Sequence, residues 1–87
     1  NLASIFTLTG DVYYQQKNYS KAEEFYTKSK DLYAKFFSTS HPEYVKVQSK
    51  LAKVYYMEKD FKKAKKYIEE SLDNYEGFIR EYFPALS

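Results

Sequence analysis

The sequence repeats itself with a period of 42 residues, and this period constrains the fold more than any other feature. A shift by that length aligns Val12-Tyr13-Tyr14 with Val54-Tyr55-Tyr56, and Lys21-Ala22 with Lys63-Ala64, without a gap. Internal repeats of a few tens of residues are typical of solenoid proteins, in which one small unit stacks on its copies. We therefore expect the 87 residues to form two copies of one structural unit.

Apolar residues recur at three- and four-residue spacing over four stretches, which predicts four amphipathic helices. We expect helices over about residues 2–16, 19–37, 42–58 and 61–82, with Pro84 ending the last one. Asn18 tolerates the left-handed conformation of a tight turn, and Asn18 and Asp60 can cap the helices that follow. No stretch alternates as a β-strand would. The sequence therefore predicts an all-α fold of two antiparallel helix-turn-helix hairpins that bury their apolar faces by stacking.

Each expected helix carries one stripe of residues that should be buried in this stack. In the first two helices the stripes contain Leu2, Ile5, Phe6, Thr9, Val12 and Tyr13, then Ala22, Phe25, Tyr26, Ser29, Leu32, Tyr33, Phe36 and Phe37. In the last two helices they contain Tyr44, Val47, Leu51, Val54 and Tyr55, then Ala64, Ile68, Ser71, Leu72, Tyr75, Phe78 and Ile79.

Composition argues against several classes of function. The net charge of +2, from 14 basic and 12 acidic residues, is too balanced for a nucleic-acid partner. His41 is the single histidine and there is no cysteine, so a catalytic triad or a multi-histidine metal site cannot be assembled; we expect His41 to be a plain loop residue. We expect no enzyme, no cofactor and no metal. The lack of cysteine and of a long apolar run favours a cytoplasmic protein without membrane contact.

Small and aromatic residues stand at equivalent places in the two repeats and resemble the signature positions of the tetratricopeptide repeat. They are Gly10, Tyr13, Tyr19, Ala22 and Tyr26, with Ala52, Tyr55, Phe61, Ala64 and Ile68. Gly10 against Ala22, and Ala52 against Ala64, should let the helices of a hairpin approach closely. The resemblance implies a fragment of a right-handed superhelix, with one repeat at about 2–41, a second at about 42–83, and residues 84–87 starting a following segment.

Two narrower resemblances concern the repeat length and the end of the chain. The usual repeat has about 34 residues, so this one is about two helical turns longer. A long second helix followed by His41-Pro42-Glu43-Tyr44 resembles the kinesin-light-chain class, although Thr7-Leu8 and Ser49-Lys50 stand where that class has paired asparagines. Residues 78–87 are similar to the segment that closes such arrays in bacterial proteins with a caspase-like (CHAT) peptidase domain. Because the chain opens at Asn1 rather than at methionine, we expect it to be a piece of a longer protein.

The resemblance implies that the first helix of each hairpin lines a concave wall that binds a partner. The wall residues are then Thr7, Asp11, Tyr14, Gln15, Lys46, Ser49, Lys50, Lys53, Tyr56 and Met57. Their lysines and tyrosines would suit an acidic peptide or a C-terminal carboxylate. We therefore expect a protein–protein interaction module that stacks on adjacent repeats in its parent protein.

Two alternatives stay open. The chain is a regulatory segment of a protease whose catalytic domain follows it, or it is a structural spacer with weak self-association through the flanks Leu2-Ile5-Phe6 and Tyr82-Phe83.

Overall fold

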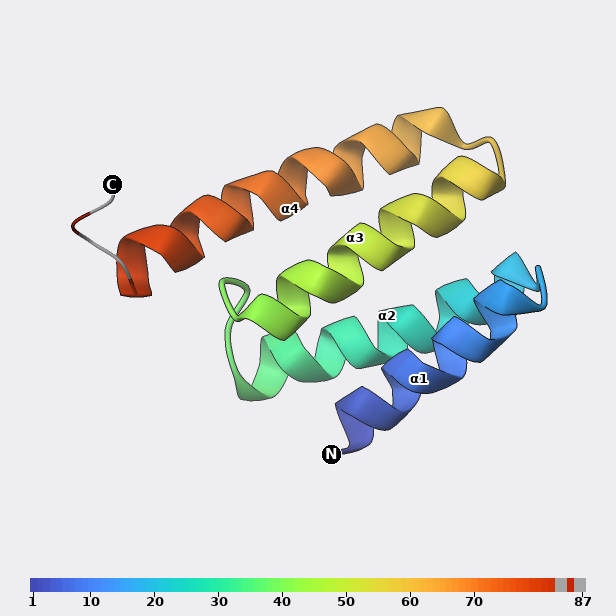
Figure 1. Ribbon diagram of the computed structural model, residues 1–87, viewed down its shortest axis with the longest axis horizontal. Helices are drawn as coiled ribbons and strands as arrows, with labels where there is room; N and C mark the ends of the chain where they lie inside the picture. Colours follow the sequence, from blue (N-terminus) through green and yellow to red (C-terminus); the bar gives the residue numbers. More distant parts are fainter. Residues whose placement is uncertain (83–84, 86–87) are drawn as a thin grey trace.

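In the computed structural model the chain forms four helices arranged as two antiparallel hairpins, which follow one another in chain order across the molecule (Figure 1). The structure describes residues 1–82 and 85, without the side chains of Phe78, Glu81 and Tyr82, and this part contains no strand. The helices are α1 (Leu2–Gln15), α2 (Tyr19–Phe36), α3 (Pro42–Met57) and α4 (Phe61–Tyr82). Each bound lies within one residue of the prediction, and the all-α fold is confirmed.

The turns inside the two hairpins have the same backbone conformation, because the sequence repeats there. Lys17 has φ 61°, and the N–H of Asn18 donates to the carbonyl of Tyr13 at 2.9 Å. This arrangement is a Schellman motif, which satisfies the last carbonyl groups of α1. The Asn18 side chain then accepts from the N–H of Lys21 at 3.3 Å. Lys59-Asp60 repeats the motif, so both caps are as expected, whereas the left-handed residue is the lysine and not the asparagine.

His41 is the residue that caps the start of α3, and it packs against the end of the first hairpin. Its Nδ1 accepts from the N–H of Glu43 at 3.1 Å, and Pro42 at the first helical position has no N–H to satisfy. The His41 ring lies 5.8 Å from that of Tyr33 and 4.8 Å from that of Phe37, measured between centroids. His41 is thus a loop residue before Pro42, as expected, and the structure adds that it caps α3 and packs on the first hairpin.

The core lies where α3 packs across the first hairpin. Val47, Leu51 and Val54 of α3 are completely buried, and they belong to one cluster with Tyr26 and Tyr33 of α2. Burial of side chains of this size stabilises the fold by about 1.5 to 3 kcal/mol each. The stripe predicted for α3 is confirmed here, and it holds the two hairpins together.

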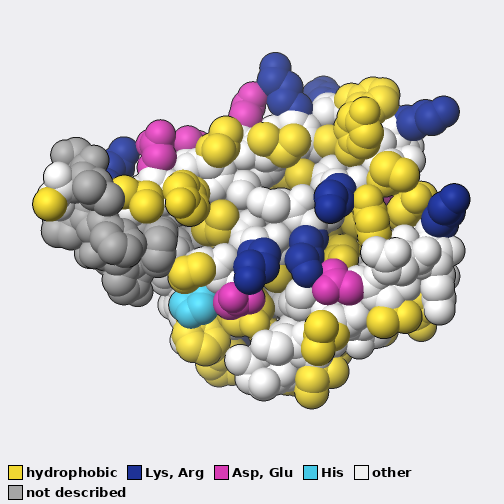
Figure 2. Space-filling view, viewed as in Figure 1, with side chains coloured by type: hydrophobic (Ala, Val, Ile, Leu, Met, Phe, Trp, Pro, Cys, Tyr) yellow, Lys and Arg dark blue, Asp and Glu magenta, His cyan; other side chains and the backbone are white. Residues whose placement is uncertain are grey.

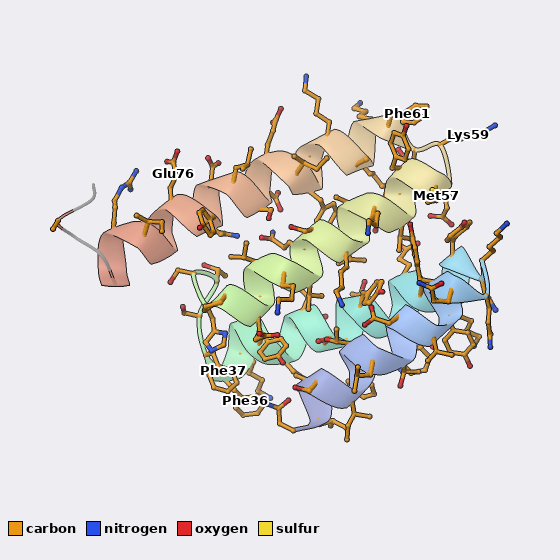
Figure 3. The ribbon with its side chains drawn as sticks, in the orientation of Figure 1. Phe36, Phe37, Met57, Lys59, Phe61 and Glu76 are labelled. Atoms are coloured by element: carbon orange, nitrogen blue, oxygen red, sulfur yellow. The ribbon has the colours of Figure 1, made fainter. Side chains whose placement is uncertain are left out.

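The stripes predicted for α1 and α4 are wrong over much of their length. The exposed members are Leu2, Ile5 and Val12 on α1 and Ile68, Leu72 and Tyr75 on α4, each at least half exposed. Phe36 and Phe37, at the end of α2, are also exposed (Figure 3). The reason is geometric: α1 and α4 are the outer helices, and the described chain covers one side of each.

Gly10 permits a close approach, but the group that approaches is the ring of Tyr26 rather than Ala22. A Cβ added at Gly10 would lie 2.6 Å from two ring carbons of Tyr26, well inside van der Waals contact. Ala22 is itself completely buried in the same hairpin. Gly10 therefore makes room for the ring of Tyr26. The predicted contact of Gly10 with the small residue Ala22 is not the one that requires a glycine.

Two expectations concern the end of the chain. The predicted end of the last helix at Pro84 lies outside the described residues, as does the segment 84–87 apart from Ala85. No helix in the described part combines the length and the hydropathy that crossing a bilayer requires.

Candidate functional site

Six side chains from three helices surround an open hollow of about 260 Å³, which we call the α1–α3 groove. They are Asp11, Tyr14 and Gln15 of α1, Tyr26 of α2, and Lys50 and Lys53 of α3. Basic and acidic side chains gather over the middle of the face shown in Figure 2, where α3 runs. The first helices of both hairpins therefore contribute charged groups to one surface.

Asp11 organises the polar contacts of this groove. Lys50 Nζ donates to both carboxylate oxygens of Asp11 at 3.0 Å, and the Tyr26 hydroxyl donates to the same carboxylate. The side chains of Lys50 and Asp11 are 30% and 37% exposed, so the ion pair contributes about 0.2 to 1 kcal/mol. This network ties three helices together, and it occupies Lys50.

The phenol groups of the groove stay protonated well above neutral pH. Burial raises the pKa of Tyr26, and the hydrogen bond to Asp11 and the charge of that carboxylate raise it further. Burial also raises the pKa of Tyr14, with a smaller contribution from Tyr19. Neither phenol carries a charge; the Tyr14 hydroxyl and ring can meet a ligand, whereas the Tyr26 hydroxyl already donates to Asp11 and its ring is buried.

Lys53 is the groove cation that stays available to a ligand. Its Nζ lies 5.8 Å from the centroid of the Tyr14 ring, and no ion pair joins it to a carboxylate of the described residues. The Tyr14 ring is in turn held by an edge contact with Tyr19, at 5.6 Å between centroids. Lys46, by contrast, lies 3.4 Å from Glu43.

The structure brings together half of the expected wall residues. Asp11, Tyr14, Gln15, Lys50 and Lys53 line the α1–α3 groove. Thr7 lies between α1 and α2, where its Oγ1 is 2.6 Å from Ser29 Oγ. Ser49 and Tyr56 line a hollow between α3 and α4, Lys46 lines another beside Tyr75, and Met57 is exposed at the end of α3 (Figure 3).

Tyr26 is the groove residue that sequence reasoning missed, since its helical spacing places it in the core. Its ring is in the core, at 2% exposure, but its hydroxyl reaches Asp11 in the groove. The identity of Gly10 is the one signal in the sequence, because a missing side chain leaves room for a ring to pass. Within the described residues, no group of three histidine, aspartate or glutamate side chains could hold a metal ion.

Stacked antiparallel hairpins whose first helices line a shared groove define a helical repeat protein of the solenoid class. Residues 1–77 match the family model of the tetratricopeptide repeat. The chain therefore belongs to the tetratricopeptide repeat family. Neither the curated proteins nor the solved structures contain a match to it.

Proposed function

We propose that this chain is a protein–protein interaction module that binds an extended peptide in the α1–α3 groove. Tetratricopeptide repeat domains generally bind proteins or peptides. The observation that carries the proposal is the groove itself, because both hairpins line it and Lys53 points a cation at it without a carboxylate partner among the described residues.

The charges of the groove favour a ligand with a single carboxylate. Lys50 already neutralises Asp11, so Lys53 leaves the groove with one positive charge in excess. An ammonium group beside a tyrosine ring can donate a charge-assisted hydrogen bond to a carboxylate while the ring packs on the adjoining apolar atoms. We infer that the ligand offers a C-terminal carboxylate or one acidic side chain, next to an apolar side chain that contacts Tyr14.

The decisive experiment changes Lys53 alone. Replacing Lys50 as well would break the ion pair with Asp11 and so change the charge of the groove in a second way. Random peptides fused to the C-terminal end of a phage coat protein, so that each one ends in a free carboxylate, provide a defined probe. We expect peptides enriched on the natural chain to lose about tenfold or more in affinity towards Lys53→Glu, as measured by calorimetry.

The matched control is Lys62→Glu, the same change at an exposed position outside the groove. It should leave the affinity unchanged. Failure to enrich any peptide, or equal binding to natural chain and Lys53→Glu, would reject the groove as the binding surface.

Three narrower statements stay proposals supported by the sequence alone. His41-Pro42-Glu43-Tyr44 supports the kinesin-light-chain class, and residues 78–87 support a parent with a caspase-like peptidase domain, for which this chain would be the recognition arm. His41 also caps α3, and this structural role would explain a histidine at this position in any class of tetratricopeptide repeat. A cytoplasmic location stays a prediction from the lack of cysteine. Parent sequence beyond Ser87 with a His/Cys pair on an α/β pattern would support the protease, and its absence there would reject it.

A further inference from the structure

Residues at equivalent places in the two repeats differ in burial in one consistent way on the first helices. Val47 and Val54 of α3 are 0% exposed, whereas Ile5 and Val12, 42 residues earlier on α1, are 57% and 55% exposed. The difference arises because α3 packs on the hairpin before it and the described chain places nothing at the same side of α1. Leu2, Ile5, Leu8 and Val12 thus form an uncovered stripe, which we call the α1 stripe.

The second helices differ in the opposite direction. Tyr26 and Tyr33 of α2 are 2% exposed, because α3 covers them, whereas Ile68 and Tyr75 on α4 are 50% and 53% exposed. Hydrophobic side chains lie along α4 in Figure 2. Between α3 and α4 they border a hollow of about 290 Å³, the α4 groove, which is lined by Ser49, Ala52, Lys53, Tyr56, Ile68, Ser71 and Leu72.

The chain therefore contains one complete interface between repeats, formed by α3 and the first hairpin. It also exposes the equivalents of the two surfaces of that interface, one on α1 and one on the second hairpin. In the complete interface, α3 packs on α2. The α1 stripe is the repeat equivalent of the packed face of α3, and the α4 groove is the repeat equivalent of the surface that receives it. The two outer surfaces of a single molecule are thus complementary to each other.

Both exposed surfaces are more apolar than the interface inside the molecule. Leu8 stands at the position equivalent to Lys50, and Leu72 at the position equivalent to Lys30. Both leucines are more than 60% exposed. Contiguous exposed apolar side chains of this kind mark interaction surfaces, because leaving them in water costs free energy.

The charged positions also agree. Inside the molecule Lys53 of α3 and Asp11 of α1 line the same groove. Asp11 and Lys53 are 42 residues apart, so they occupy the same position in the two repeats. In a contact between two molecules, Lys53 in the α4 groove of one copy would take the place of Asp11, and Asp11 on α1 of the other copy would take the place of Lys53. Docking of α1 into the α4 groove would bring these opposite charges to the same place, with their helices exchanged.

We propose that the chain associates head to tail with a second copy of itself, the α1 stripe of one molecule entering the α4 groove of the next. The contact repeats between molecules the packing of α3 on α2 within one molecule. The contact joins two different surfaces, so an assembly of any length still has one α1 stripe and one α4 groove open at its ends. It therefore grows without a fixed end point, unless the rotation between successive copies closes a ring. The proposal does not depend on peptide binding in the α1–α3 groove.

Sedimentation velocity of the full chain tests this pairing. We expect the weight-average sedimentation coefficient to rise continuously between about 10 µM and about 1 mM. Ile5→Lys with Val12→Lys should block the α1 stripe, and Ile68→Glu with Leu72→Glu should block the α4 groove. Each double variant alone should stay monomeric, and an equimolar mixture of the two should form a dimer and stop there, because each contributes one intact surface.

Circular dichroism establishes that the variants remain folded, as expected since all four side chains are at least half exposed. Ser20→Lys with Ala34→Lys adds the same charge as the first variant at exposed positions of α2 and should associate like the natural chain. A natural chain that is monomeric at about 1 mM, association of either blocked variant alone, or a monomeric mixture would each overturn the proposal.

Discussion

At the scale of single residues, the contact between Gly10 and the Tyr26 ring sets how closely α1 approaches α2. A methyl group at Gly10 would overlap two ring carbons at 2.6 Å, whereas a methyl group at Gly77 would meet only Ser40 Cβ, at an ordinary 3.7 Å. The same substitution at these two glycines of the chain should therefore have opposite effects.

We expect Gly10→Ala to lower the free energy of unfolding by about 1 to 2 kcal/mol, because overpacking outweighs the better helix propensity of alanine. Gly77→Ala should raise it by about 0.5 to 1 kcal/mol through propensity alone. Urea denaturation followed by circular dichroism measures both. A stabilised Gly10→Ala would show that the ring does not lie against this glycine.

Tyr26 should make the fold sensitive to alkaline pH. Its pKa in the fold is raised, chiefly by burial, above the value of about 10 that the unfolded chain has. Its contribution to stability is complete below about pH 10 and is lost as the pH rises beyond that value, because the unfolded chain releases the proton first. The free energy of unfolding should fall by up to about 1.4 kcal/mol per pH unit for this group.

Tyr26→Phe removes this share of the pH dependence while keeping the ring. Urea denaturation at about pH 9 and about pH 11 should therefore show a smaller alkaline loss in the variant than in the natural chain. Some loss will remain, because burial and the neighbouring Glu23 also raise the pKa of Tyr55. Equal losses in the two proteins would contradict the protected position of the Tyr26 hydroxyl.

At the scale of the helices, the two tight turns contain an unfavourable choice of residue. Lys17 and Lys59 hold left-handed conformations, at φ 61° and 64°, which cost a residue with a Cβ about 1 kcal/mol or more. Glycine adopts this conformation without that cost. Since both turns have the same hydrogen bonds, they should respond alike.

We expect Lys17→Gly and Lys59→Gly each to raise the free energy of unfolding by about 0.5 to 1 kcal/mol. Lys66→Gly is the control, since the same change inside the exposed face of α4 should lower it by about 1 kcal/mol. Thermal denaturation separates the three variants. Destabilisation by all of them would mean that the turns are not left-handed.

The bounds of the helices could be predicted because their signals are local. Asn18 and Asp60 cap the helices next to them, and Pro42 stands at the first position of its own helix. The burial of Ile5 and Ile68 could not be predicted in the same way, because helical spacing shows which side of a helix is apolar and not what covers it. A stripe that the fold buries and a stripe that the described residues leave exposed have the same pattern.

At the scale of the whole molecule, the candidate site depends on how the hairpins are offset. The resemblance to a repeat family implies that the first helices line a binding wall, and five residues of that expected wall, Asp11, Tyr14, Gln15, Lys50 and Lys53, line the α1–α3 groove. It could not show that Lys50 is already paired with Asp11, because these residues lie 39 apart in the sequence and meet only through the stacking. The contribution of Tyr26 from α2 depends on the same packing.

The central claim is that the two hairpins stack as repeats, with α3 across the first hairpin. Two contacts between hairpins report on it: Lys50 Nζ lies 5.9 Å from the Tyr26 ring centroid, and Lys30 Nζ lies 5.5 Å from that of Tyr67. A nuclear Overhauser spectrum of the full chain measures such proximities between lysine methylenes and tyrosine rings. We predict cross-peaks for both pairs. Their absence, in a spectrum that shows the contact of Tyr55 with Tyr67 inside the second hairpin, would mean that the hairpins fold without stacking and would contradict the groove and everything built on it.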